Sequence, residues 1–372
     1  MMRSVFRWGV IGSCALLLLL GLGSSGAQAA PAWQDPTPQP SASDQECLAC
    51  HGQPDQIAPL PSGESLYLTI DSEAFAGSLH GQAAVGCTEC HADITGYPHP
   101  PLEEQNLRQV AVDFSQACQA CHAEQFAQQL DSIHQVVRDQ GNENAAVCSD
   151  CHNPHYTQPP AEPRSKIITT CARCHSGIAQ EYRASVHGAA LTGAENPDVP
   201  SCIDCHGVHN IPDPRTAQFL LNSPNLCASC HTDAQKMAPY GLNTNVLNTY
   251  VADFHGTTVT LFEKRSPDQL PNKPVCIDCH STHNIKSVQD PESSVIKDNL
   301  LTTCQKCHPS ATANFSGAWL SHYTPSPEHY PLVYYVGLFY QIFIPATIGG
   351  MAVFVASDIG RRLVRRIKGG RK

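Results

Sequence analysis

The stretch Cys202-Ile-Asp-Cys-His206 carries the pattern that decides the fold: two cysteines separated by two residues and followed at once by a histidine. This CxxCH pattern occurs nine times in 372 residues and uses 18 of the 19 cysteines. Cysteines three residues apart lie on one side of a helical turn, where both can form thioethers with the vinyl groups of one porphyrin. The histidine that follows can then ligate its iron. The spacing predicts nine covalently attached haem c groups.

The residues predicted to hold these groups follow directly from the nine motifs. The attachment cysteines are Cys47, Cys50, Cys87, Cys90, Cys118, Cys121, Cys148, Cys151, Cys171, Cys174, Cys202, Cys205, Cys227, Cys230, Cys276, Cys279, Cys304 and Cys307. The proximal iron ligands are His51, His91, His122, His152, His175, His206, His231, His280 and His308.

Paired cysteines have three other common uses in proteins. Zinc ribbons need two CxxC pairs, or one pair with two spaced histidines, and thioredoxin-like motifs need a single pair. Disulfides account for an even number of cysteines. None of these uses requires a histidine directly after every second cysteine, so haem attachment is the preferred interpretation.

Ten further histidines remain for the second axial position of nine irons. The predicted distal ligands are His80, His99, His134, His155, His187, His209, His255, His283 and His322. His329 is the tenth, and its role is left open. Only Met237 offers a thioether in this region. Ligation by two histidines leaves no vacant position for a substrate and gives lower potentials than His/Met ligation.

The motifs belong to an internal repeat. One unit reads aromatic-x-x-Ser-x-His, CxxCH, a further His, and a second CxxCH. Four copies have their first histidines at His80, His134, His187 and His255, and each contains two motifs. The motif at 47–51 precedes them as a half unit, and residues 315–323 resemble the start of a fifth unit. Helices are expected over 124–137 and 177–190, each bringing a Ser-x-His to its end.

The expected fold is mainly α with extensive loops: a haem-packed domain of repeated CxxCH units at 44–330. That domain has few residues for each porphyrin, and the chain is rich in Pro and Gly, with 29 and 25. We therefore expect the porphyrins to form most of the apolar interior and the apoprotein to be largely unfolded. Residues 31–357 contain 14 Lys and Arg against 32 Asp and Glu. This balance disfavours nucleic acid as a partner; it fits a basic redox partner or a solvated acidic face.

The two ends predict export and membrane attachment. Residues 1–29 have the basic start, apolar stretch and small-residue site of a cleaved signal peptide, which includes Cys14. An uncleaved anchor is the alternative. A Pro- and Ser-rich linker follows at 30–43. Residues 331–357 are predicted to form one transmembrane helix, and a buried core helix is the alternative.

The tail 358–372 contains seven Lys and Arg. It predicts a cytoplasmic C-terminus in a bacterial cytoplasmic membrane, with the haem domain on the periplasmic or outer side. Pro345, Gly349 and Gly350 in the predicted span hint at an integral membrane partner, although a lone anchor can also contain such residues.

Over residues 47–322 the CxxCH-x-x-His and Ser-x-His-Gly sequences resemble the low-potential multihaem cytochromes c of the doubled-CxxCH class. The resemblance implies covalent haem at each motif and bis-histidine ligation by the Ser-x-His and CHxxH histidines. The chain is similar in role to membrane-anchored quinol dehydrogenase cytochromes of the NapC/NirT class. Those have an N-terminal anchor and fewer haems, whereas a C-terminal span is more like subunits that pair with a membrane b-type cytochrome.

These observations predict an electron-transfer protein and not an enzyme. Electrons are expected to pass from a quinol pool, directly or through a membrane b-type cytochrome, to a soluble periplasmic or an extracellular acceptor. A multihaem reductase of a small nitrogen or sulfur oxyanion is the alternative, and it requires one iron with an open face. A structural or storage role is a third possibility.

Overall fold

The computed structural model describes residues 42–270 and 272–369. The predicted signal peptide, Cys14 and all but the last two residues of the predicted linker lie outside these ranges. The described residues are mainly helical, as predicted. Their one sheet is a hairpin in which β1 (Ile57–Pro59) pairs antiparallel with β2 (Ser65–Tyr67).

The helices before the C-terminal one are mostly short. In chain order they are α1 (Ala42–His51), α2 (Ser72–Ala76), α3 (Leu79–Gln82), α4 (Cys87–Cys90), α5 (Leu107–Phe114), η1 (Ser115–Ala120), α6 (Ala123–Leu130), α7 (Ile133–Asp139), α8 (Cys148–Cys151), α9 (Lys166–Ala172), α10 (Ser176–Arg183), α11 (Val186–Ala194), α12 (Cys202–His206), α13 (Ala217–His231), α14 (Ala234–Met237), η2 (Ala238–Tyr240), α15 (Val246–Ala252), α16 (Phe254–Arg265), α17 (Cys276–His280), α18 (Lys297–Gln305) and α19 (Ala313–Gly317).

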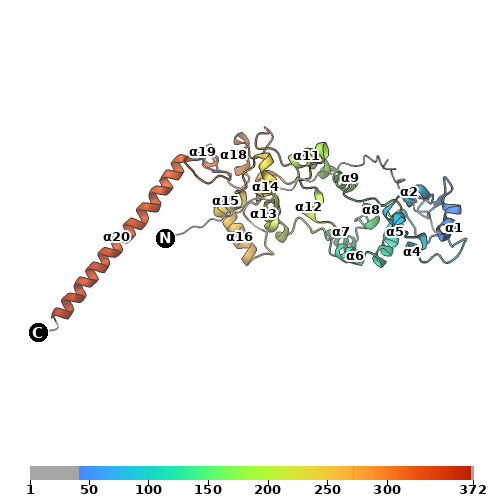
Figure 1. Cartoon of the computed structure of the whole chain (residues 1–372), viewed down its shortest axis with the longest axis horizontal. Coiled ribbons are helices and arrows are strands. Elements are labelled where there is room, and N and C mark those ends of the chain that lie inside the picture. The colour runs from blue at the N-terminus through green and yellow to red at the C-terminus, as the bar shows by residue number, and fades with distance from the viewer. Residues whose placement is uncertain (1–41, 271, 370–372) are drawn as a thin grey trace, which may run out of the picture.

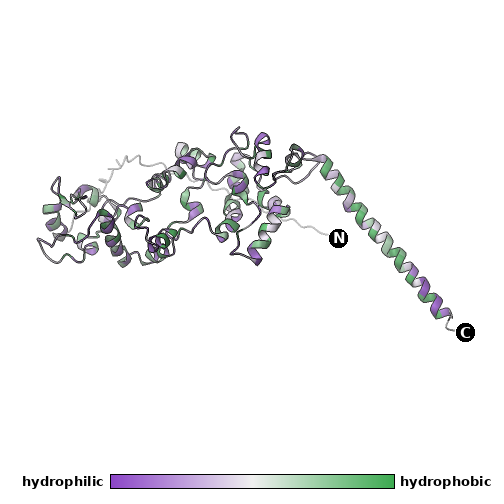
Figure 2. Cartoon of the chain, turned by 180° about the vertical axis from the view of Figure 1, so that it is seen from behind, coloured by the Kyte–Doolittle hydropathy of each residue, from purple (hydrophilic) through white to green (hydrophobic). Residues whose placement is uncertain are grey.

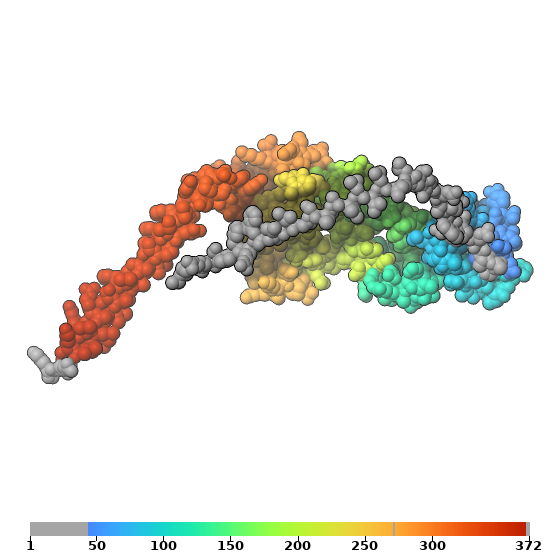
Figure 3. Space-filling model, in the orientation of Figure 1, coloured from blue at the N-terminus to red at the C-terminus, as the bar shows by residue number. Residues whose placement is uncertain are grey.

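These elements form an elongated array that broadly follows chain order, with α1 at one end and α19 near the other (Figure 1). The space-filling view shows the same elongated body continuing into the C-terminal helix (Figure 3). Such a shape is expected of repeats that mainly contact their neighbours. It places the first CxxCH motif far from the C-terminal helix and the last motifs close to it.

The nine motifs, called sites 1 to 9 in chain order, occupy two kinds of helix position. At the even-numbered sites the first cysteine begins a short helix: α4, α8, α12 and α17. At the odd-numbered sites the motif lies at the end of α1, η1, α9, α13 or α18. The sequence explains the difference, because the even motifs have an acidic residue directly before their second cysteine and the odd motifs do not.

That acidic side chain caps its own helix at three of the four even sites. The backbone N–H of Ser201 donates to Asp204 Oδ2 at 2.6 Å, and Asp150 and Asp278 accept the equivalent bonds at sites 4 and 8 at 2.7 Å. At site 2 the cap comes from elsewhere, because buried Asp44 of α1 accepts from the Cys87 N–H at 2.8 Å. Capping satisfies N–H groups that a helix start leaves without partners.

The helices expected over 124–137 and 177–190 are each broken in two, which corrects the prediction. Ser132 and Ser185 end one helix and cap the next, their side chains being 1% exposed. The Ser185 hydroxyl accepts from the Gly188 N–H at 3.0 Å. Serine favours such caps because its side chain competes with the helical backbone for hydrogen bonds. Ser78 caps α3 in the same way, and Asp253 takes this role for α16.

The hydrophobic core of the described residues is small. One buried cluster joins Ile168, Ala179 and Leu191, and a second joins Leu221, Val259 and Val275. Clusters of this size are smaller than the single contiguous core usual for a domain of this length. This agrees with the expectation that bound porphyrins supply apolar interior.

The C-terminal helix α20 runs from Pro331 to Gly369, over 39 residues. It is about 58 Å long at the usual rise per residue. It is apolar along most of its length and polar at its C-terminal end (Figure 2). Among the described residues it is the one helix long and apolar enough to cross a membrane. The predicted span and the start of the basic tail thus form one continuous helix, since Arg and Lys are good helix formers.

Candidate functional site

The structure brings each of the nine motif histidines close to the ring of one predicted distal histidine. The ring centroids of these pairs lie 6.0 to 6.3 Å apart. From site 1 to site 9 the pairs are His51 with His99, His91 with His155, His122 with His80, His152 with His209, His175 with His134, His206 with His283, His231 with His187, His280 with His322, and His308 with His255.

This spacing fits an iron between two imidazoles. Two metal–nitrogen bonds of about 2.0 Å, plus about 1.1 Å from each nitrogen to its ring centre, add up to about 6.2 Å. Among the described residues, no group of three or more His, Cys, Asp or Glu side chains converges on a common point. The residues therefore fit a metal held by two histidines inside a macrocycle better than zinc held by cysteines and histidines alone.

At sites 3, 5, 7 and 9 both histidines come from one repeat unit. The partner of each motif histidine lies on the helix capped by the Ser or Asp of the same unit: His80 on α3, His134 on α7, His187 on α11 and His255 on α16. We describe these four sites as closed within a unit, because both of their histidines come from the same repeat unit.

At the other five sites the partner comes from the following unit. Sites 2, 4 and 6 pair with His155, His209 and His283, each three residues after the motif histidine of the next even site. The two ends follow the same rule: His99 of the first full unit pairs with the half unit at site 1, and His322 of the truncated fifth unit pairs with site 8. These five sites are closed between units.

Backbone hydrogen bonds repeat at the same junctions. The Leu79 N–H donates to the carbonyl of Thr157 at 2.8 Å, Ile133 donates to Ile211 at 2.8 Å, and Val186 donates to Ile285 at 2.9 Å. Each donor directly precedes the histidine of a capped helix, and each acceptor follows a between-unit histidine by two residues. The junctions are therefore built alike in three successive units.

Comparison with known proteins agrees with this arrangement. A family model described as the doubled CXXCH motif matches residues 134–180, which contain sites 4 and 5. The multiheme cytochrome MtrA of Shewanella baltica (strain OS185) is 25% identical over 203 residues, which cover 52% of this chain and 53% of that protein. These matches support a multihaem c-type cytochrome with doubled CxxCH motifs. The chain spans about half the length of the curated relative that it matches, and no solved structure matches it.

Four ring nitrogens of the cytochrome's paired histidines have hydrogen-bond partners that orient the ring. Nδ1 of His51 lies 3.0 Å from the carbonyl of Leu68, Nδ1 of His80 3.0 Å from that of Pro154, and Nδ1 of His99 2.8 Å from that of Pro100. Nδ1 of His322 lies 3.2 Å from Thr249 Oγ1. A carbonyl only accepts, so at the first three rings Nδ1 carries the proton and Nε2 is free to ligate iron.

Burial keeps many of the paired imidazoles neutral, which is the form that binds a metal. Loss of hydration lowers the pKa of His187 and of His280 to about 4. For His280 the nearby His322 adds a smaller effect in the same direction. Burial also lowers the pKa of His91, His134, His152, His155, His206, His209, His231, His283 and His322.

The cysteines show that successive sites are neighbours. The first cysteines of sites 3 and 4, 5 and 6, and 7 and 8 lie close enough to shift each other's pKa: Cys118 with Cys148, Cys171 with Cys202, and Cys227 with Cys276. Between sites 1 and 2, Cys47 lies close enough to Cys87 to help raise the pKa of Cys87. Burial raises the pKa of the second cysteine at sites 2, 4, 6 and 8, and a nearby cysteine of the following site raises it further. The nine sites therefore form one row in chain order.

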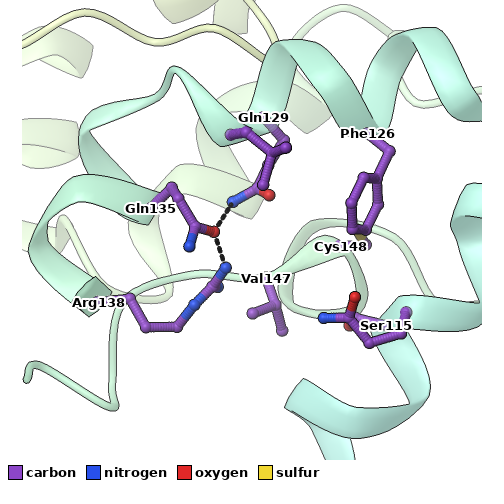
Figure 4. Close-up of a pocket in the computed structure, with 9 residues that line it drawn as sticks. Ser115, Phe126, Gln129, Gln135, Arg138, Val147 and Cys148 are labelled. Atoms are coloured by element: carbon purple, nitrogen blue, oxygen red, sulfur yellow. Dashed lines mark hydrogen bonds between the residues drawn. The ribbon is translucent and has the colours of Figure 1, made fainter.

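A cavity of about 260 Å³ opens beside Cys148 of site 4. Phe126 lies next to Cys148 on one side, and Gln129, Gln135 and Arg138 form a hydrogen-bonded row on the other (Figure 4). An apolar wall at the attachment cysteine and a cationic group opposite suit the edge of a ring that carries carboxylates. The cavity thus fits part of the predicted cofactor.

The tenth histidine, His329, has no histidine partner among the described residues. Its ring stacks on Tyr323 with centroids 4.8 Å apart and an interplanar angle of 7°. The sequence singled out the nine histidines that lie beside motif histidines, but it did not show which motif histidine each one lies beside, because the repeat does not reveal which ones reach across a junction. The sequence also gave no signal for Thr249, whose contact with the His322 ring depends on how distant parts of the chain pack together.

Proposed function

We propose that this cytochrome binds nine haem c groups, one at each site, and carries electrons along the row between its membrane end and its far end. Each group is held by two thioethers and by the pair of histidines that the fold brings together. When bound, the group supplies an iron that changes between the ferric and ferrous states. The observation that carries the proposal is the uniform 6.0 to 6.3 Å spacing of nine histidine pairs.

The protein's own part in this function is to hold the sites in order and to keep their ligands fixed. The first cysteines of sites 1 and 2, 3 and 4, 5 and 6, and 7 and 8 lie next to each other, so neighbouring sites are held close together. Two fixed imidazoles at each site leave no iron position for a substrate, which favours electron transfer over the reductase alternative.

Haem quantitation tests the central claim. The purified full-length protein should contain nine haems per chain, all low-spin in the oxidised form by electron paramagnetic resonance (EPR). A colourless protein, bound zinc, or fewer haems than motifs would contradict the proposal. Carbon monoxide binding to several reduced haems would instead support open iron sites and the reductase alternative.

The membrane end is proposed to receive the electrons. Sites 8 and 9 lie on helices α17 and α18. Helix α18 lies near α19 and the start of α20 (Figure 1). A quinol pool is the proposed donor, through an integral membrane partner such as a b-type cytochrome. Full-length protein in membranes should be reduced by a quinol only when that partner is present. Reduction of the pure protein by quinol at the same rate would remove the need for a partner.

The orientation follows from the positive charges at the end of α20. Arg361, Arg362, Arg365, Arg366 and Lys368 lie in its last turns. The positive-inside rule places them in the cytoplasm and the haem domain in the periplasm or outside. In sealed spheroplasts, added protease should remove the haem domain and spare a C-terminal tag. Loss of the tag with an intact haem domain would reverse the orientation.

The far end is proposed to deliver electrons to a basic redox protein. Residues 42–107, called the acidic end, contain ten Asp and Glu and no Lys or Arg, whereas residues 108–330 have 21 acidic and 14 basic residues. Eight of the ten acidic residues are exposed: Glu46, Asp55, Glu64, Asp71, Glu73, Glu89, Asp93 and Glu103. A one-sign surface around a terminal site attracts an oppositely charged partner and raises its association rate.

Electron transfer to a small basic redox protein should slow as salt is raised above 0.1 M, where screening acts over about 10 Å. The variant Glu46→Gln, Asp55→Asn, Glu73→Gln, Asp93→Asn should slow it at low salt by about tenfold. The control Glu181→Gln, Glu263→Gln, Asp268→Asn, Asp298→Asn removes the same charge elsewhere and should have little effect. Equal slowing by both variants would rule out a local docking surface.

A further inference from the structure

The last between-unit junction differs from the three before it. Its ligand His322 lies in residues 318–330, called the strap, which connect α19 to the membrane helix α20. At the earlier junctions the chain is held by a backbone N–H that donates to a carbonyl two residues after the ligand. At the strap, side chains that precede or lie on α15 make the contacts instead.

Three residues make these contacts and are called the α15 clamp: Asn243, Asn245 and Thr249. The side-chain amide of Asn243 donates to the carbonyl of His322. Asn245 Nδ2 donates to Thr324 Oγ1 at 3.1 Å. Thr249 Oγ1 lies 3.2 Å from His322 Nδ1. The clamp thus holds both the backbone and the ring of the strap histidine.

The hydrogen bonds of Thr249 decide which nitrogen of His322 carries the proton. A hydroxyl has one hydrogen, and Thr249 Oγ1 donates it within its own helix, where it lies 3.0 Å from the carbonyl oxygens of Asn245 and Val246. With the hydrogen used there, the oxygen can only accept from the Nδ1–H of His322. Nε2 is then unprotonated and free to ligate iron opposite His280, whose ring centroid is 6.2 Å away.

We infer that the α15 clamp is the positioning element that makes His322 the iron ligand of site 8 and thereby fixes the strap of the membrane helix to the haem domain. This inference rests on the proposed function, because it needs haem at site 8. At the three other rings with a fixed Nδ1 the acceptor is a backbone carbonyl, which no substitution removes. Site 8 is the one where a side chain can be changed to test the arrangement.

The experiment compares Thr249→Val, Thr249→Ser and His322→Ala in the full-length, haem-loaded protein. His322→Ala identifies the site 8 signal, because about one-ninth of the low-spin intensity should be lost. Thr249→Val should shift the midpoint potential of that same haem upward, since an imidazole without its Nδ1 acceptor is a weaker donor to ferric iron. Thr249→Ser keeps the hydroxyl and should behave like the natural protein.

Thr192→Val is the matched control, because the Thr192 hydroxyl also donates to a carbonyl of its own helix, that of Gly188 at 2.7 Å. Its potentials should not change. Should Thr249→Val assemble poorly, Asn243→Ala provides a second reading: protease cleavage within 318–330 should become at least about tenfold faster.

Two results distinguish a failure of the proposed function from a failure of the clamp alone. Natural protein without nine low-spin haems overturns the proposed function itself. Nine low-spin haems with a Thr249→Val variant whose potentials are unchanged, or with the change at a haem other than the one marked by His322→Ala, overturns only the clamp.

Discussion

The sites closed within a unit differ from the sites closed between units in the source of the distal histidine and, except for site 1, in the place of the CxxCH motif on its helix. Within-unit sites 3, 5, 7 and 9 have their motif at a helix end and their partner histidine on a capped helix. Between-unit sites 2, 4, 6 and 8 have their motif at a helix start. Site 1 has its motif at a helix end, but its distal histidine, His99, comes from the following unit. The two classes share one chemistry but have different mechanical roles, because only the second connects one repeat to the next.

The imidazole planes are closer to parallel at most between-unit sites than at the within-unit sites, and sites 4 and 5 have nearly the same angle. The interplanar angles are 12°, 17°, 36°, 26° and 20° at sites 1, 2, 4, 6 and 8. They are 52°, 35°, 56° and 46° at sites 3, 5, 7 and 9. A loop and a helix present the ring in different ways, so the source of the distal histidine also sets the geometry at the metal.

The largest expected effect is the loss of a between-unit ligand. His209→Ala should remove the iron bridge between the second and third units and cost about 4 kcal/mol or more. Protease should then cut the haem-loaded protein between α9 and α12, and the first thermal transition should fall. His187→Ala removes a within-unit ligand and should change one haem spectrum without opening that junction. Equal cleavage of both variants would contradict the division into two classes.

Gly188→Ala should damage a within-unit site by breaking the support of its histidine. A Cβ at Gly188 would lie 1.9 Å from the carbonyl oxygen of Tyr182, so the capped helix would have to move. We expect a loss of about 2 kcal/mol in denaturant unfolding.

Gly193→Ala on the same helix is the control, since a Cβ there meets nothing within 4 Å. It should be neutral or stabilising by up to about 1 kcal/mol. A Gly188→Ala variant as stable as Gly193→Ala would show that the tight approach does not hold His187.

Ser281→Gly should stabilise a between-unit loop. Ser281 has φ 68° and ψ 169°, a region that is essentially restricted to glycine, and the equivalent position at site 6 is Gly207 with φ 74°. Relief of this strain should add about 1 kcal/mol to the free energy of unfolding, and Gly207→Ser should remove a similar amount. An unchanged midpoint of denaturant unfolding for both variants would show that the backbone at these positions is not strained.

The smallest effect is spectroscopic and leaves stability unchanged. Low-spin ferric haems with nearly parallel imidazole planes give rhombic EPR spectra, and inclined planes move the signal toward larger g values. The oxidised protein should therefore show two families of signals, and His155→Ala should reduce the rhombic family. A single family for all nine haems would remove the geometric part of the comparison.

Several residues show which features of the structure could be predicted from the sequence and which could not. The CxxCH spacing and the surplus of histidines predicted nine distal ligands, and the structure places each of these histidines beside a motif histidine. The Ser-x-His pattern was recognised as a repeat, but Ser132 and Ser185 were placed inside continuous helices. Helical periodicity extends across a capping serine, so only the backbone reveals the break.

The sequence by itself determined the cofactor chemistry and the apolar terminal helix. A covalent attachment motif and a long uncharged stretch are local patterns that need no folded context. The partnership of the histidines was decided by the tertiary structure alone, because ring spacing depends on how one repeat packs on the next. The same is true of Thr249 and His322, which are far apart in the chain and meet only when α15 and the strap lie side by side.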